Sequence, residues 1–160
     1  MIRIFYEEEV KPKDGLKEFL NLTNKKGIVS GIATSGSEEL LVSSLKRLKI
    51  LDYFSVINSC SQLNTTKFLP DIYLETAKEM NVSPKNTLVF EDVLHGIKSA
   101  KNVGFKTVGV KDKSNIFEFE EIEQVSDFVI EDFKDSKLLK YLFENNYKEN
   151  NCKNIGDESL

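Results

Sequence analysis

Three short segments of this 160-residue chain place polar or charged side chains beside the end of an apolar run. Thr34 and the two residues after it follow one apolar run, and Glu91 with Asp92 follows another. Lys67 lies between these segments, shortly before Pro70, which favours the start of a helix. A hydroxyl, a lysine and an acidic pair are the groups that magnesium-dependent phosphoryl transfer requires.

Each group has a plausible role in such a site, because ligands of open α/β sheets bind beyond the carboxyl ends of the strands. Thr34, with the amides of Ser35 and Gly36, can hold phosphate oxygens, and Lys67 can neutralise the charge of the transferring group. We therefore predict Lys67 and Thr34 as catalytic groups. Carboxylates suit a hard cation such as Mg²⁺, so Glu91 and Asp92 are the predicted metal ligands.

Taken singly, each segment also has an ordinary structural explanation. A Thr-Ser-Gly-Ser run more often forms a turn and a helix cap than a phosphate-binding site. A lysine before a helix is usually solvated, and an acidic pair after a strand often lies in an ordinary loop. Their combination at strand ends favours a phosphoryl-transfer site. We expect His95, the single histidine, at a helix start near the rim of the site, and Cys60 in the core.

The elements that must position these groups alternate between β-branched runs and helical periodicity, which predicts an α/β fold with a mostly parallel sheet. Strands are predicted over residues 28–33, 54–57, 87–90, 106–110 and 128–130. Helices are predicted after caps at Asp14 and Ser37, from Pro70 onward, and over residues 97–103 and 136–143.

The composition is that of an ordinary globular protein, with 40% hydrophobic and 30% charged residues. A net charge of −4 gives no reason to expect a nucleic-acid partner. No apolar run approaches the roughly 20 residues of a membrane span. Residues 1–10 lack the apolar core of a signal peptide, so we expect a cytoplasmic location.

At these residues the chain resembles the haloacid dehalogenase (HAD) superfamily, particularly its β-phosphoglucomutase-like and phosphoglycolate-phosphatase-like branch. Thr34 matches the motif II hydroxyl, Lys67 the motif III lysine, and Glu91 with Asp92 the motif IV acids. The resemblance implies a HAD-like Rossmannoid core over residues 10–144. It also implies Mg²⁺ as cofactor, and a phosphatase or phosphomutase reaction on a small phosphorylated metabolite through an aspartyl-phosphate.

The family's motif I, an Asp-x-Asp-Gly segment that provides the nucleophile, does not occur in this sequence. In this family the strand that ends in motif I lies between the strands that carry motifs II and IV. We therefore expect the central first strand and the cap domain to be missing or replaced. Residues 1–9 are then a linker, a remnant of the cap or a replacement strand that brings Glu7 or Glu9 near the site. Residues 145–160 are polar and expected to be a disordered tail.

Two functional hypotheses remain open from the sequence. In the first, the chain supplies the phosphate- and metal-binding part of a HAD-type enzyme, and a homodimer or a complementing N-terminal segment completes the sheet. In the second, the chain is a truncated or pseudo-enzyme that acts as a non-catalytic phosphate-binding or scaffold protein. A phosphate-accepting receiver domain fits less well, because it requires an acceptor aspartate as well as a separate acidic pair.

Overall fold

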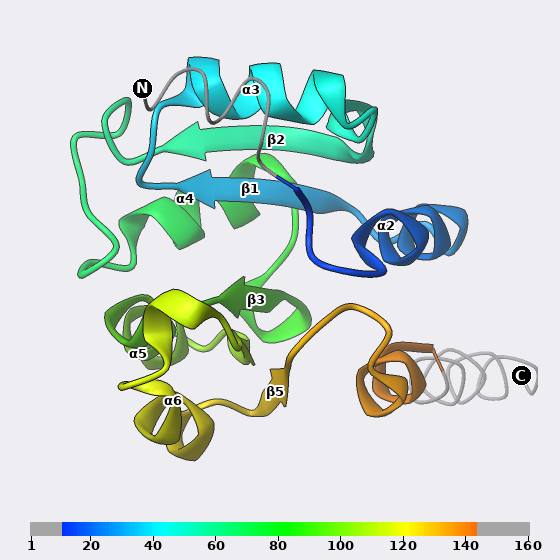
Figure 1. Cartoon of the computed structure of the whole chain (residues 1–160). Coiled ribbons are helices and arrows are strands. Elements are labelled where there is room, and N and C mark those ends of the chain that lie inside the picture. The colour runs from blue at the N-terminus through cyan, green and yellow to red at the C-terminus, as the bar shows by residue number, and fades with distance from the viewer. Residues whose placement is uncertain (1–10, 144–160) are drawn as a thin grey trace, which may run out of the picture.

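Strands and helices alternate along the chain, as the sequence pattern predicts (Figure 1). The computed structural model describes residues 11–143. Its strands are β1 (Ser30–Thr34), β2 (Phe54–Ser59), β3 (Leu88–Glu91), β4 (Lys106–Val110) and β5 (Phe128–Ile130). Its helices are α2 (Leu16–Lys25), α3 (Glu38–Arg47), α4 (Asp71–Glu79), α5 (Leu94–Asn102), α6 (Phe119–Val125), a helix over residues 136–143, and the short 3-10 helices η2 (Leu51–Tyr53), η3 (Pro84–Asn86) and η4 (Lys113–Asn115).

The strands form two parallel sheets, one of β1 and β2 and the other in the order β3-β4-β5. The arrows of β1 and β3 point the same way, with β3 on the side of β1 opposite β2 (Figure 1). All the observed pairs are parallel, which confirms the predicted α/β class with a mostly parallel sheet. The carboxyl ends of both sheets therefore lie on one side of the molecule, where parallel strands place their ligand sites.

Helices on both faces join the two sheets. On one face, α4 contacts β1 and β2, and its Tyr73 and Ala77 share a core cluster with Ala100 of α5. On the other face, α2 contributes to both halves, because Leu20 packs in the cluster of the β1–β2 half and Phe19 in that of the β3–β5 half. Burial of such apolar side chains stabilises the fold by roughly 1.5–3 kcal/mol each.

The predicted strands over residues 106–110 and 128–130 have the observed bounds, and Ser37 caps α3 by accepting a hydrogen bond from the Leu40 amide at 3.5 Å. The prediction that Asp14 caps a helix was wrong. Gly15, with φ of 77°, precedes α2, whereas the Asp14 carbonyl accepts a hydrogen bond from the Phe133 amide at 2.9 Å. The Asp14 carboxylate pairs with the Lys134 ammonium at 3.4 Å and makes no cap hydrogen bond.

Two helices differ from expectation. Helix α5 begins at Leu94, three residues before the start of the helix predicted over residues 97–103. Val93 has extended backbone angles and is the N-cap of this helix. Helix α6 was not predicted. It is rich in glutamate, and only its Ile122 is buried, against Gly109 of β4, where a Cβ would lie 2.5 Å from an Ile122 methyl.

Among residues 11–143, no helix combines the length and apolar character needed to cross a membrane. The hypotheses for residues 1–9 and for the tail 145–160 concern segments outside the described residues.

Candidate active site

The side chain of Glu91, the last residue of β3, is the centre of the candidate site. This side chain is 3% exposed, and both of its oxygens accept hydrogen bonds. Oε2 accepts from the Lys67 ammonium at 2.7 Å and from the Tyr73 hydroxyl at 2.9 Å. Oε1 accepts from the backbone amides of Asp92 at 3.1 Å and Val93 at 3.3 Å. A buried charge is tolerated only with this kind of pairing, so these contacts hold Glu91 and Lys67 in one geometry.

The electrostatics of this cluster keep the Glu91 carboxyl ionised. Burial by itself raises the pKa of Glu91, but the Lys67 ammonium and the hydrogen bonds outweigh that effect, and the pKa lies below its usual range. Burial and the Glu91 charge together raise the pKa of the Tyr73 hydroxyl. Tyr73 therefore stays protonated and remains a hydrogen-bond donor.

Gly96, in the first turns of α5, allows this close packing. A Cβ at Gly96 would lie 2.6 Å from the Tyr73 hydroxyl oxygen and 2.9 Å from Cγ of Glu91. Any larger side chain would separate α5 from the acid that ends β3. A glycine is therefore required at this position, because the side chains of Tyr73 and Glu91 leave no space for a methyl group.

Asp92 follows β3 and is only partly buried, so its carboxylate is more accessible than that of Glu91. Burial and the neighbouring Glu91 raise the pKa of Asp92. The backbone at Asp92 is held by Asn115, whose amide group donates to the Asp92 carbonyl at 2.8 Å and to the Val110 carbonyl at 2.9 Å. Asn115 therefore ties the loop after β3 to the end of β4.

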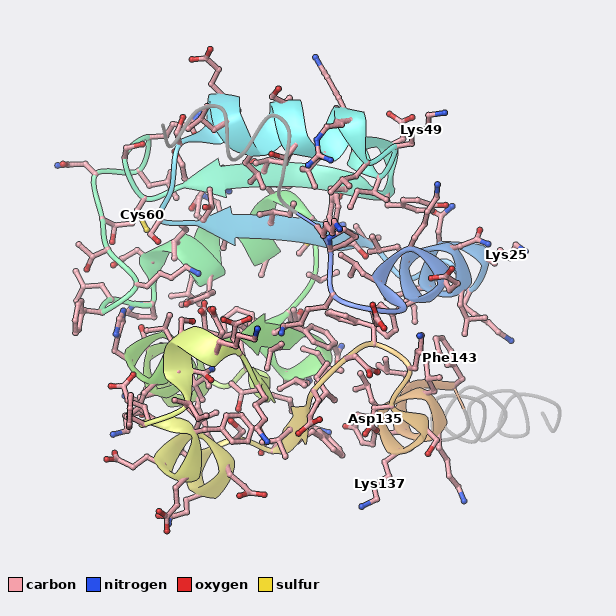
Figure 2. The ribbon with its side chains drawn as sticks, in the orientation of Figure 1. Lys25, Lys49, Cys60, Asp135, Lys137 and Phe143 are labelled. Carbon is pink, nitrogen blue, oxygen red and sulfur yellow. The ribbon has the colours of Figure 1, made fainter. Side chains whose placement is uncertain are left out.

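The hydroxyl segment forms a separate turn at the end of β1. The Thr34 hydroxyl oxygen accepts a hydrogen bond from the Gly36 amide at 3.0 Å, and Ser35 and Gly36 are exposed. In the described part of the chain, no hydrogen bond joins this turn to the Lys67 or Asp92 side chains. The two groups are linked through the backbone, because the loop that carries Lys67 starts at Cys60, whose amide donates to the Thr34 carbonyl at 2.8 Å (Figure 2).

A cavity of about 140 Å³ lies between β1 and β3. Its walls are β1, through Gly31 and Ala33, and β3 together with the preceding residue, through residues 87–91. One side of the cavity is lined by Tyr73, residues 76–77 and Met80, which belong to α4 and to the residue that follows it. Phe105 completes the lining. The hydroxyl turn and the acidic cluster therefore stand at the ends of two strands that do not pair with each other.

Two expectations about neighbouring residues are met. His95 lies at a helix start, as the second residue of α5, and its ring stacks on that of Phe68 with centroids 3.9 Å apart. Cys60 is buried in the core, and burial raises the pKa of its thiol.

Sequence reasoning missed the positioning roles of Tyr73, Gly96 and Asn115. The first two are part of the motif III and motif IV segments, which was the available signal. Asn115 has no such signal, because its role depends on a contact 23 residues away.

Comparison with known proteins shows the family. The haloacid dehalogenase-like hydrolase family matches residues 2–110. The chain is 32% identical over 103 residues to the phosphorylated carbohydrates phosphatase of Thermotoga maritima, which covers 64% of this chain and 48% of that protein. The chain thus belongs to the haloacid dehalogenase-like hydrolases, in their phosphoglucomutase- and phosphatase-like branch.

Solved structures agree with this assignment. A T. maritima protein assigned as a β-phosphoglucomutase has a TM-score of 0.68 at 29% identity, covering 81% of this chain and 59% of that chain. A haloacid dehalogenase-like protein of Agrobacterium tumefaciens has a TM-score of 0.74 at 25% identity, covering 88% and 65%. The chain spans about half the length of the curated relatives it matches.

Proposed function

We propose that this chain supplies the phosphate- and metal-binding part of a HAD-type phosphatase or phosphomutase site. The observation that carries the proposal is the ion pair of half-buried Lys67 with buried Glu91, beside the more accessible Asp92 at the carboxyl end of β3. Lys67 neutralises charge on a phosphoryl group, and Glu91 fixes the position of Lys67. Thr34 and the amides of Ser35 and Gly36 bind phosphate oxygens.

The donor set at the end of β3 suits Mg²⁺ in part. Asp92 offers a carboxylate whose ionised form is disfavoured by burial and by the adjacent Glu91, and a bound divalent cation would relieve that cost. Within residues 11–143, no group of three or more His, Cys, Asp or Glu side chains is arranged to hold a metal. Asp92 would therefore be the main protein ligand from this chain, with Glu91 behind it and water as the remaining ligands. The ion would supply charge stabilisation for the transferring phosphoryl group.

A small phosphorylated sugar is the proposed substrate class. The support is the similarity to a phosphatase of phosphorylated carbohydrates and to a structure assigned as a β-phosphoglucomutase. The nucleophilic aspartate of such a reaction would come from sequence other than these 160 residues.

Calorimetric titration of Mg²⁺ into the purified chain tests the metal role. We expect Asp92→Asn to weaken binding about tenfold or more, because it removes the charged ligand. Asp52→Asn is the matched control, since it makes the same change at an exposed residue in η2, before the amino end of β2. Equal binding by both variants and the unchanged chain would remove Asp92 from the site.

Hydrolysis of p-nitrophenyl phosphate by the same samples separates the two functional hypotheses. Turnover that requires Mg²⁺ and disappears in Asp92→Asn would support an enzyme active as this chain alone. Metal binding without turnover would support a chain that binds but does not react by itself.

A further inference from the structure

Phe68 is a large apolar residue that lies on the surface of the chain. It is 70% exposed, and Leu69 after it is 53% exposed. The Phe68 ring stacks on the His95 ring, with centroids 3.9 Å apart and an angle of 8° between the planes. Since the imidazole covers one face of the Phe68 ring, the exposed area belongs to its other face and its edge. Adjoining exposed apolar side chains, unlike single ones, mark binding surfaces.

This ring stack lies next to the groups proposed to bind phosphate and metal. Two successive residues of the loop before α4 contact the segment that ends β3 and begins α5. Lys67 turns inward and donates to Glu91 at 2.7 Å, whereas Phe68 stays exposed and stacks on His95. His95 follows Asp92 by three residues. Because adjacent Cα atoms are only about 3.8 Å apart, a ligand held at Lys67 can reach the open face of Phe68.

We propose that the stacked rings of Phe68 and His95, here called the ring platform, bind a planar aromatic ring of the substrate. The substrate is then a phosphorylated sugar that also carries such a ring, as a nucleoside monophosphate does. Its phosphate binds at Lys67, and its aromatic ring stacks on the open face of Phe68. This inference rests on the proposed phosphate-binding role of Lys67 and adds to it a residue that selects the substrate.

The chemistry of the ring platform favours an aromatic ring over a bare sugar. Sugar hydroxyls require hydrogen-bond partners, and the side chains of Phe68 and Leu69 offer none. A nucleobase has a flat π-face, and stacking one base on an aromatic side chain improves affinity about fivefold to a hundredfold. The Phe68 ring is already held by His95, so little side-chain freedom is lost when a third ring stacks on it.

NMR titration of the full chain at one fixed Mg²⁺ concentration tests the proposal. The two probes are adenosine 5′-monophosphate and ribose 5-phosphate, which has the same sugar and phosphate but no base. His95 is the single histidine, so its carbon-bound ring protons report on the ring platform alone. The amides of Ser35 and Gly36 report on phosphate binding. Phe68→Leu removes the ring and keeps an apolar side chain, and Phe117→Leu is the matched control at a phenylalanine that is 98% exposed.

We expect adenosine 5′-monophosphate to bind about fivefold or more tightly than ribose 5-phosphate, and to shift the His95 ring protons, in the unchanged chain and in Phe117→Leu. Phe68→Leu should bind both probes with the affinity that the unchanged chain has for ribose 5-phosphate. Equal binding of the two probes by the unchanged chain, or a preference that persists in Phe68→Leu, would overturn the proposal. An equal loss of affinity for both probes in Phe68→Leu would overturn it too, because the stack would then only fix the loop. If ribose 5-phosphate leaves the Ser35 and Gly36 amides unshifted, the proposed phosphate site itself is refuted, and this inference with it.

Discussion

Replacement of Lys67 by methionine should destabilise the chain strongly at neutral pH. The Lys67 ammonium lies 2.7 Å from Oε2 of Glu91, whose side chain is 3% exposed. Removing one partner of a buried pair leaves an uncompensated charge, which typically costs 3–5 kcal/mol. The Tyr73 hydroxyl and two backbone amides still donate to Glu91, so we expect about 3 kcal/mol, near the lower end.

The pH dependence of this loss gives a second, independent readout. In the unchanged chain the pKa of Glu91 is lowered, so its contribution to stability is present above the unfolded pKa of about 4.3 and is lost as pH falls. Without Lys67, burial dominates and raises the pKa of Glu91 above the unfolded value. The contribution of Glu91 is then favourable at low pH and is lost as pH rises. The stability difference between the two proteins should therefore shrink from pH 7 toward pH 4.

Urea unfolding followed by circular dichroism between pH 4 and pH 8 measures both effects. Lys78→Met is the matched control, because Lys78 pairs with Glu75 on the exposed surface of α4 and should show no resolvable change. The double variant Lys67→Met with Glu91→Gln should recover much of the loss, since no charge is left buried. The reasoning is refuted if Lys67→Met unfolds at the same urea concentration as Lys78→Met, or if its loss does not depend on pH.

Three further substitutions probe neighbouring contacts. Tyr73→Phe should lower the free energy of unfolding by about 1–2 kcal/mol, because Glu91 loses one buried hydrogen bond; an unchanged urea midpoint would contradict this. Gly96→Ala should lower the free energy of unfolding by about 1–3 kcal/mol, because the added methyl group clashes with Tyr73 and Glu91. Gly36→Ala should be nearly neutral, because its methyl group would make one contact, at 3.4 Å. Thermal melts of the two variants measure the difference. Asp92→Asn should leave stability at pH 7 equal or slightly higher, because its ionised form is disfavoured in the folded chain. A clear loss in the same melts would show that the Asp92 charge stabilises the fold.

The candidate site shows where local reasoning succeeds. Lys67, Glu91 and Asp92 were identified by residue type and by their position near strand ends, and the structure brings Lys67 into contact with Glu91. The roles of all the site residues in binding phosphate or metal stay predictions. Sequence position alone did not reveal that Glu91 is almost wholly enclosed, because its donors Lys67 and Tyr73 precede it by 24 and 18 residues.

Features that depend only on near neighbours in the chain could be predicted from the sequence. Periodicity and β-branched content predicted the α/β class and the bounds of β4 and β5, and Ser37 was identified as a cap because capping involves only the next few residues. Tertiary structure decided what depends on distant partners. The Asp14 carbonyl pairs with the Phe133 amide, and α6 is held by Ile122 against Gly109. The pairing of β1 with β2 and of β3 with β4 belongs to the same class, since backbone pairing across a sheet joins residues that no local pattern connects.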